Sequence, residues 1–189
     1  MIRLSDLSSI LKKPITIEKN SSLSHVISEL LKNNISRLIV TDETSPVGII
    51  TEKDIGLFLL DDDTEKNLDE IPVSQIMNRL TSVNDSVDIE TCVEIMLEKG
   101  IGSLGVSSNG EGLVGIITKS DIAQYYAQKY TGSHKIGDVM TISYLSMNSD
   151  DTLRNVVSKM IDEKISRIFL KNKNNDPEGI LTFRDLFHV

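Results

Sequence analysis

The sequence predicts an α/β (α+β) protein made of tandem copies of one β-α-β-β-α unit. Three repeated features predict it: a strand-like string, a second string of the form G-h-h-T-x-x-D (h is apolar), and an amphipathic helical pattern upstream of both. The paired strings are NISRLIV at 34–40 with GIITEKDI at 48–55, GIGSLGV at 100–106 with GIITKSDI at 115–122, and KISRIFL at 164–170 with GILTFRDL at 179–186. Such self-similarity indicates repeated structural units.

Each unit begins with a β-rich stretch and a helix. The β-rich stretches are Ile15-Thr16-Ile17, Thr81-Ser82-Val83 and Tyr144-Leu145-Ser146. Apolar residues then recur at i, i+3, i+4, i+7 and i+8, which is typical of one helix face; they are Leu23, Val26, Ile27, Leu30, Leu31, then Ile89, Cys92, Val93, Met96, Leu97, then Leu153, Val156, Val157, Met160, Ile161. We expect N-caps from the polar clusters at 20–22, 84–86 and 149–151.

A hairpin and a second helix complete each unit. Polar turns at 41–46, 107–112 and 171–177 separate two apolar runs, the pattern of two strands joined by a turn. The second run ends in Thr, where a helix is expected to begin. Cys92 occupies the helix position held by Val26 and Val156, which favours a packed thiol over a nucleophile or a metal ligand.

The repeats are expected at 6–60, 73–127 and 135–189, with an acidic linker at 61–72. Residues 61–70 (DDDTEKNLDE) favour a solvated connection. A unit of about 55 residues is too small to be stable alone, so repeats 1 and 2 are expected to pair within the chain. Repeat 3 is then expected to pair with repeat 3 of another molecule in a two-fold homodimer, or to lack a fourth repeat that has been cut away.

Composition excludes several classes of protein. The 189 residues include 20 basic and 28 acidic side chains, and a formal charge of −8 argues against nucleic-acid binding. No apolar run approaches the roughly 18 residues that span a membrane, and the N-terminus lacks an apolar secretion signal. One cysteine makes no internal disulfide, so a cytoplasmic setting is expected.

The repeated unit resembles the CBS domain, named for cystathionine β-synthase, over nearly the whole chain. The resemblance rests on the G-h-h-T-x-x-D strings and the I-S-R-h-h-V-like strands before them. It implies that two repeats form a Bateman module, which binds AMP, ADP, ATP, S-adenosylmethionine or, less often, other nucleotides or metal ions between them. It further implies regulation of a partner protein rather than catalysis, with no catalytic cofactor.

The T-x-x-D residues suit a nucleoside phosphate. A Thr at a helix start lies among unpaired N–H groups that favour an anion, and an Asp offers two acceptor oxygens to a ribose diol. The resemblance likewise assigns ribose and phosphate contacts to these residues, which are Thr51, Asp54, Thr118, Asp121, Thr182 and Asp185. The alternative is a capping box, in which the Asp returns to the Thr N–H and stabilises the helix. Capping does not exclude binding.

Basic residues near the motifs are candidates for phosphate contacts. Arg37 and Arg167 match the family position after I-S, whereas repeat 2 has Ser103 there. Lys53, Lys119 and Arg184 lie inside the motifs and could reach the same anion, although a solvent-facing role is favoured for Lys53 and Lys119. The sequence therefore predicts a regulatory sensor of adenosine compounds, acting on an unidentified partner. The alternatives are a ligand-independent dimerisation scaffold and, less favoured, an enzyme.

Overall fold

The computed structural model describes residues 11–61, 66–109 and 112–188. The chain forms two compact units, each of which combines segments from different repeats. Unit 1 contains the described residues of Met1–Ser21, Leu38–Ile49 and Met77–Gly132, and unit 2 contains those of Ser22–Arg37, Ile50–Ile76 and Ser133–Val189. Repeat 1 therefore contributes to both units, whereas repeat 2 lies in unit 1 and repeat 3 in unit 2.

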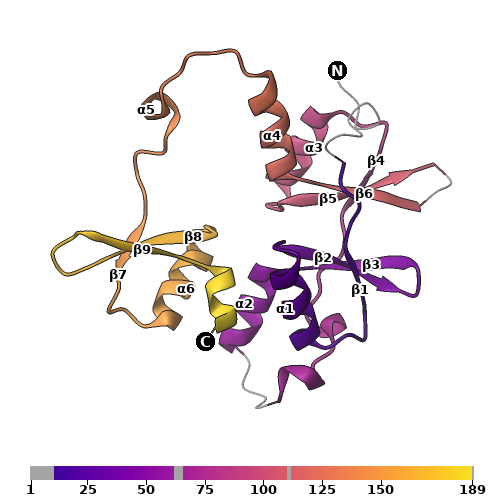
Figure 1. The fold of residues 1–189 in the computed structure, drawn as a ribbon, viewed down its shortest axis with the longest axis horizontal. Helices are drawn as coiled ribbons and strands as arrows, with labels where there is room; N and C mark the ends of the chain where they lie inside the picture. Colours follow the sequence, from indigo (N-terminus) through magenta and orange to yellow (C-terminus); the bar gives the residue numbers. More distant parts are fainter. Residues whose placement is uncertain (1–10, 62–65, 110–111, 189) are drawn as a thin grey trace. The chain divides into compact units, whose positions relative to one another are not determined.

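Each repeat contains a three-stranded sheet, as the predicted fold class requires (Figure 1). Repeat 1 consists of β1 (Thr16–Glu18), α1 (Leu23–Lys32), β2 (Arg37–Asp42), β3 (Ser45–Thr51) and α2 (Glu52–Asp61). Repeat 2 consists of β4 (Ser82–Asn84), α3 (Ile89–Glu98), β5 (Ser103–Ser108), β6 (Gly112–Thr118) and α4 (Lys119–Lys129). Repeat 3 consists of β7 (Ser146–Asn148), α6 (Leu153–Asp162), β8 (Arg167–Lys171), β9 (Pro177–Thr182) and the 3₁₀ helix η4 (Phe183–His188).

The sheet order is the same in every repeat. The first strand pairs in parallel with the second, as β1 does with β2 and β7 with β8. The second strand forms an antiparallel hairpin with the third, as β5 does with β6. A parallel pair needs a crossover connection, and α1, α3 and α6 supply it. The third strand thus lies at one edge of its own sheet.

Two of the predicted N-caps were placed too early. Ser22 caps α1 as expected, but Asp88 caps α3 and Thr152 caps α6, each directly before the first helical residue. A cap side chain must reach the N–H of the second or third helical residue, so the polar residues farther upstream lie out of range. The hydrogen bond from the Thr91 backbone N–H holds the pKa of Asp88 below its ordinary value.

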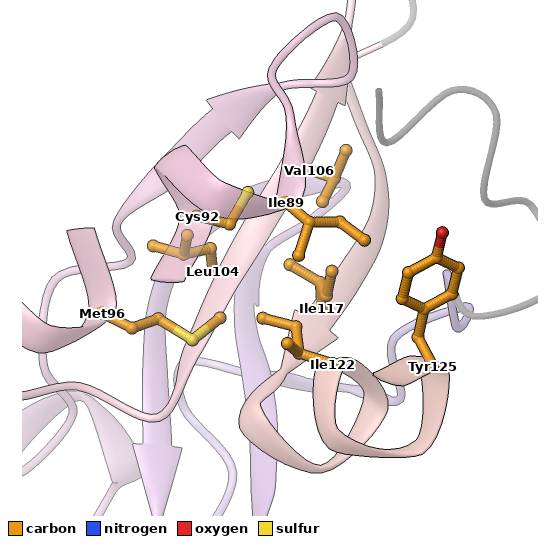
Figure 2. Close-up of a cluster of buried hydrophobic side chains, with 8 residues drawn as sticks. All are labelled: Ile89, Cys92, Met96, Leu104, Val106, Ile117, Ile122 and Tyr125. Atoms are coloured by element: carbon orange, nitrogen blue, oxygen red, sulfur yellow. The ribbon is translucent and has the colours of Figure 1, made fainter. Parts of the chain in front are cut away.

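The core of unit 1 lies between α3, α4 and the strands of repeat 2 (Figure 2). Its buried members are Ile89, Cys92, Met96, Leu104, Val106, Ile117, Ile122 and Tyr125. Cys92 is fully buried, and burial raises the pKa of its thiol to about 11. The expectation of a packed thiol is confirmed, because an un-ionised, inaccessible sulfur is neither a nucleophile nor a metal ligand.

Repeats 1 and 2 are joined in unit 1 by two reciprocal backbone bridges. The chain before β1 crosses the edge of β6, where Lys12 and Ile116 exchange hydrogen bonds of 3.3 and 3.0 Å. The chain before β4 crosses the edge of β3, where Asn78 and Ile49 exchange two bonds of 2.8 Å. Lys12 and Asn78 both lie four residues before the first strand of their repeat, so the two bridges are equivalent. We call these crossing segments straps (residues 11–12 and 77–78).

A glycine lies beneath each strap. A Cβ on Gly115 would lie 2.5 Å from Leu11 Cγ, and a Cβ on Gly48 would lie 2.7 Å from Met77 Sδ and 2.9 Å from the backbone oxygen of Asn78. Real Cβ atoms do not approach that closely. The recurring glycine of the G-h-h-T-x-x-D string in repeats 1 and 2 therefore leaves room for the strap: the Leu11 side chain lies over Gly115, and the Met77 side chain and the Asn78 carbonyl lie over Gly48. Close approach of another segment is a common reason for glycine in a strand.

Repeat 3 packs against helix α2 of repeat 1 in unit 2. In unit 2, Leu57 and Leu60 of α2 pack against the core of repeat 3, which includes Phe183 and Leu186. A Cβ on Gly56 would lie 2.8 Å from Leu186 and 3.0 Å from Phe183. This helix contact is separate from the pairing of repeat 3 with another repeat, which stays a prediction.

The C-terminal end of the acidic linker is buried, where the sequence favours a solvated connection. Residues 62–65 lie outside the described part of the chain. Beyond them come the 3₁₀ turns η2 (Leu68–Glu70) and η3 (Val73–Gln75), with Ile71 and Val73 fully buried. The Ile71 carbonyl accepts a 2.8 Å hydrogen bond from the N–H of Leu23, at the start of α1. Burial of these two apolar side chains attaches the linker's end to repeat 1.

Replacing Gly56 by Leu is expected to lower the free energy of unfolding by about 1–3 kcal/mol, because extra carbons would be forced into a packed contact. Gly137→Leu in the short helix α5 (Ile136–Val139) is the control, since nothing lies within 4 Å of its Cβ position. Urea denaturation of both variants checks this. Equal stabilities would show that α2 does not pack closely on η4.

Candidate functional site

The T-x-x-D motif occupies the same place in each repeat, at the junction where the third strand ends. Thr51, Thr118 and Thr182 are the last residues of β3, β6 and β9. The aspartate follows in the first turn of α2, α4 or η4. Repeat 3 differs in one respect, because η4 is a short 3₁₀ helix and not an α-helix.

Each aspartate folds back onto the threonine that precedes it. Oδ2 of Asp54 accepts hydrogen bonds from Thr51 N–H (2.8 Å) and Oγ1 (2.6 Å). The corresponding distances are 3.0 and 2.6 Å for Asp121 and Thr118, and 2.7 and 2.8 Å for Asp185 and Thr182. The capping interpretation of the motif is therefore confirmed. The cap uses one carboxylate oxygen in each case, and a carboxylate has two.

The three aspartates differ in accessibility. Asp185 is exposed and Asp54 is half-buried, but Asp121 is only 1% exposed. The second oxygen of Asp121, Oδ1, lies 2.6 Å from Lys12 Nζ, an ion pair without the alignment of a hydrogen bond. A buried carboxylate needs such a partner, because an isolated buried charge is strongly disfavoured. The Asp121 carboxylate of repeat 2 thus has its counter-ion in Lys12 of repeat 1.

Sequence reasoning missed Lys12. The residue lies 109 positions before Asp121, outside any motif, and it reaches the carboxylate because the strap of repeat 1 crosses β6. The sequence indicates only that repeat 2 lacks a basic residue near its motif, since it has Ser103 where repeats 1 and 3 have arginine. Ser103 pairs across the hairpin with Thr118 and is buried, so Lys12 supplies the positive charge that this position does not.

Two of the predicted basic residues lie near their motifs. Arg167 pairs across the hairpin with Thr182 and is exposed, and directly paired residues have neighbouring side chains on one sheet face. Arg37 is half-buried and donates a 3.2 Å hydrogen bond to Ser36. Lys119 and Lys53 are exposed at the starts of α4 and α2, which agrees with the solvent-facing role favoured for both.

Arg184 contacts repeat 1, and its proposed phosphate contact stays a prediction. Its guanidinium contacts repeat 1 through all three nitrogens: Nε lies 2.5 Å from Glu52 Oε1, Nη1 donates to Asn34 Oδ1 (2.7 Å) and Nη2 donates to the carbonyl of Ile35 (2.9 Å). These contacts use three of the five N–H donors of the guanidinium. The side chain joins the motif of repeat 3 to that of repeat 1.

The part of the chain that the structure describes contains neither a candidate metal site nor a candidate membrane-spanning helix. Among those residues, no group of three or more His, Cys, Asp or Glu side chains could hold a metal ion. No described helix is long and apolar enough to cross a membrane. Tyr126 and Tyr130 on or after α4 are about half exposed, and the Tyr126 hydroxyl donates to Glu90 at 3.4 Å.

Replacing Lys12 by Met is expected to lower the free energy of unfolding by about 1–3 kcal/mol, because it leaves the buried Asp121 carboxylate without a counter-ion. The neighbouring exposed residue provides a control variant, Lys13→Met, which should have no such effect. Adding Asp121→Asn to Lys12→Met should recover part of the loss. Chemical denaturation measures all three, and a Lys12→Met chain as stable as the control would contradict the ion pair.

Solved structures share this fold. Protein MJ1225 of Methanocaldococcus jannaschii is 22% identical, with a TM-score of 0.82 over 97% of this chain and 70% of that one. The CBS domain pair of protein MJ0100, in complex with 5′-methylthioadenosine and S-adenosyl-L-methionine, is 27% identical, with a TM-score of 0.59 over 69% of this chain and 99% of that one. The CBS domain protein PAE2072 of Pyrobaculum aerophilum, complexed with AMP, is 25% identical, with a TM-score of 0.55 over 67% and 99%.

The sequence comparison agrees with the structural one. The chain spans 45% and 65% of the length of two curated relatives that it matches. The model of the CBS domain matches residues 4–61, 73–128 and 136–189, and these ranges contain all three T-x-x-D motifs and the strands that precede them. Because the matches cover most of the sequence and every copy of the unit, the chain belongs to the CBS domain family.

Proposed function

We propose that the protein is a regulatory module that binds an adenosine compound at its T-x-x-D motifs and passes the bound state to a partner protein. The observation that carries the proposal is the repeated placement of Thr and Asp at the end of the third strand. Two relatives at 25% and 27% identity hold AMP, or S-adenosyl-L-methionine with 5′-methylthioadenosine. The candidates for the ligand are therefore AMP, ADP, ATP and S-adenosylmethionine.

The cap is compatible with this chemistry. The hydrogen bonds to the threonine orient each carboxylate through Oδ2, and the second oxygen of a carboxylate can accept from a sugar hydroxyl. A cap that fixes the side chain before the ligand arrives reduces the entropy lost on binding. The same residues thus serve the helix and, in the proposal, the ribose.

The three motifs are not equivalent as phosphate sites. Repeats 1 and 3 combine the motif with an arginine, Arg37 or Arg167, which suits a phosphate through its paired donors. In repeat 2 the cation is Lys12, and it is already paired with Asp121. We therefore assign nucleoside phosphates to the motifs of repeats 1 and 3, and to repeat 2 only a ligand that displaces the lysine.

Helix α2 links the motif of repeat 1 to the motif of repeat 3. It begins directly after Thr51, and its first residue, Glu52, pairs with Arg184, which lies between Thr182 and Asp185. Gly56 and Leu57 continue the contact with repeat 3. A ligand at either motif would favour one arrangement of this contact, and any differential affinity for two arrangements shifts the population between them. A partner that contacts α2 or η4 would sense that shift.

The buried single cysteine and the acidic composition support a cytoplasmic setting for this module and a protein partner in place of a nucleic acid.

The alternative function is a ligand-independent dimerisation scaffold. The hydrogen bonds that make T-x-x-D a helix cap favour it, because they explain the motif without a ligand.

Ligand binding is tested by thermal shift and calorimetry with AMP, ADP, ATP and S-adenosylmethionine. A ligand at about a hundred times its dissociation constant should add about 2.7 kcal/mol of stability. Asp54→Asn and Asp185→Asn should each abolish binding at one site while keeping the cap, since an Asn oxygen still accepts from the threonine N–H.

The control is Thr152→Ala, which removes the cap of α6 far from any motif and should cost about 1 kcal/mol without changing affinity. No response to any of the four ligands would reject the sensor and favour the scaffold.

Coupling between repeats 1 and 3 is tested with Arg184→Met. If the Arg184 contact transmits occupancy, the Asp54→Asn change should alter affinity at the remaining site by about 5-fold or more in the wild-type background. In the Arg184→Met background that effect should vanish. Calorimetric titrations of the four chains measure it, with Lys53→Met as an exposed control. The same effect in both backgrounds would rule out Arg184 as the link.

A further inference from the structure

The motif of repeat 2 contains a buried oxygen whose charge is neutralised but whose hydrogen bonding is incomplete. Among the described residues, Oδ1 of Asp121 is the buried side-chain oxygen that forms no hydrogen bond. Lys12 Nζ lies 2.6 Å from it, but approaches outside the directions that a hydrogen bond needs. Buried polar atoms are normally hydrogen-bonded. Oδ1 therefore remains able to accept a hydrogen bond from another donor.

The Asp121 side chain is held in place and cannot turn towards another donor. Its Oδ2 accepts hydrogen bonds from Thr118 N–H (3.0 Å) and Oγ1 (2.6 Å). Ile117 and Ile122, which flank the motif, belong to the buried core of unit 1 (Figure 2). Asp121 itself is 1% exposed. The position of the acceptor is therefore fixed, and a donor has to come to it.

Lys12 is the movable member of the ion pair. Its backbone is fixed by the two hydrogen bonds that it exchanges with Ile116, but its side chain is 65% exposed. A lysine carries its ammonium on a flexible four-carbon stem. The ammonium can therefore leave Asp121 for another anion while the strap stays paired with β6.

Repeats 1 and 2 place a basic residue at opposite members of the same two positions. In repeat 1 the second strand begins with Arg37, and the strap that crosses its third strand contributes the neutral Asn78. In repeat 2 the second strand begins with the neutral Ser103, and the crossing strap contributes Lys12. A cation that is kept while its position changes indicates a shared role, and the role proposed for Arg37 is phosphate binding.

We propose that Lys12 selects the ligand of repeat 2 by charge: it leaves Asp121 for the phosphate of an anionic adenosine compound, and a ribose hydroxyl replaces it at Oδ1. This inference rests on the proposed function, because it needs an adenosine ligand at the Thr118–Asp121 motif. A phosphate gives the ammonium a new partner, so the exchange loses no ion pair. Neutral adenosine gives it none, and S-adenosylmethionine brings a sulfonium and an ammonium beside it. The ligand that displaces the lysine is therefore AMP, ADP or ATP.

The affinities of AMP and adenosine test the selection. Calorimetry is done on a chain carrying Asp54→Asn and Asp185→Asn, which removes the other two proposed sites. With Lys12 present, AMP should bind about 10-fold more tightly than adenosine. Lys12→Met should weaken AMP binding and strengthen adenosine binding, because it removes both the phosphate partner and the competitor for Asp121. A purely structural role of Lys12 would shift both affinities in the same direction.

Three further variants of the same chain control the measurement. Lys12→Arg keeps the charge and should keep the preference for AMP. Lys13→Met removes the charge of the exposed neighbouring residue and should change each affinity by less than about 2-fold. Asp121→Asn should abolish binding of both ligands, which identifies the measured site as that of repeat 2. Unchanged far-UV circular dichroism verifies that each variant is folded.

The inference and the proposed function fail on different results. Lys12→Met effects of the same sign on AMP and adenosine, or no effect on either, would overturn the inference, as would a chain in which repeat 2 binds neither ligand. The proposed function survives these results if the wild-type chain binds an adenosine compound that Asp54→Asn or Asp185→Asn abolishes. A wild-type chain that binds no adenosine compound would reject both.

Discussion

The pairing of two repeats depends on the approach of one backbone to the edge of another sheet, and a glycine makes that approach possible. Leu11 and Met77 occupy the space that a Cβ on Gly115 or Gly48 would need. Four backbone hydrogen bonds between Lys12 and Ile116 and between Asn78 and Ile49 then close two exposed strand edges. An open edge with unpaired polar groups invites association, so this geometry explains why repeats 1 and 2 are joined.

The T-x-x-D motif has two roles that the structure combines. As a cap it completes the hydrogen bonding of a helix start, which any repeat needs for stability. As a proposed ligand site it offers the oxygen that the cap does not use. The difference between the repeats arises from their surroundings: Asp121 is buried beside Lys12, whereas Asp185 is exposed and follows Thr182, which pairs across the hairpin with Arg167.

Repeat 1 contributes segments to both compact units. Its sheet edge and strap belong to unit 1 with repeat 2, and its helices α1 and α2 belong to unit 2 with repeat 3. The Glu52–Arg184 pair and the close contact at Gly56 place the motif of repeat 3 in direct contact with the helix that follows the motif of repeat 1. Regulation by ligand occupancy needs a physical connection of this kind, in which one contact responds to two sites.

The sequence by itself determined the repeated unit, its strand and helix order and the position of each T-x-x-D motif, because hydrophobic period, turn residues and the repeated strings are local properties. It also identified Cys92 as a core residue, since Val26 and Val156 occupy the same helix position. It placed two caps too early, because several adjacent polar residues could serve and only the backbone geometry selects Asp88 and Thr152.

Only the tertiary structure decided which residues from distant segments meet. Lys12 reaches Asp121, and Arg184 reaches Glu52, because strand edges and helix faces bring together residues more than 100 positions apart. No local pattern encodes such contacts, which follow from how whole repeats pack.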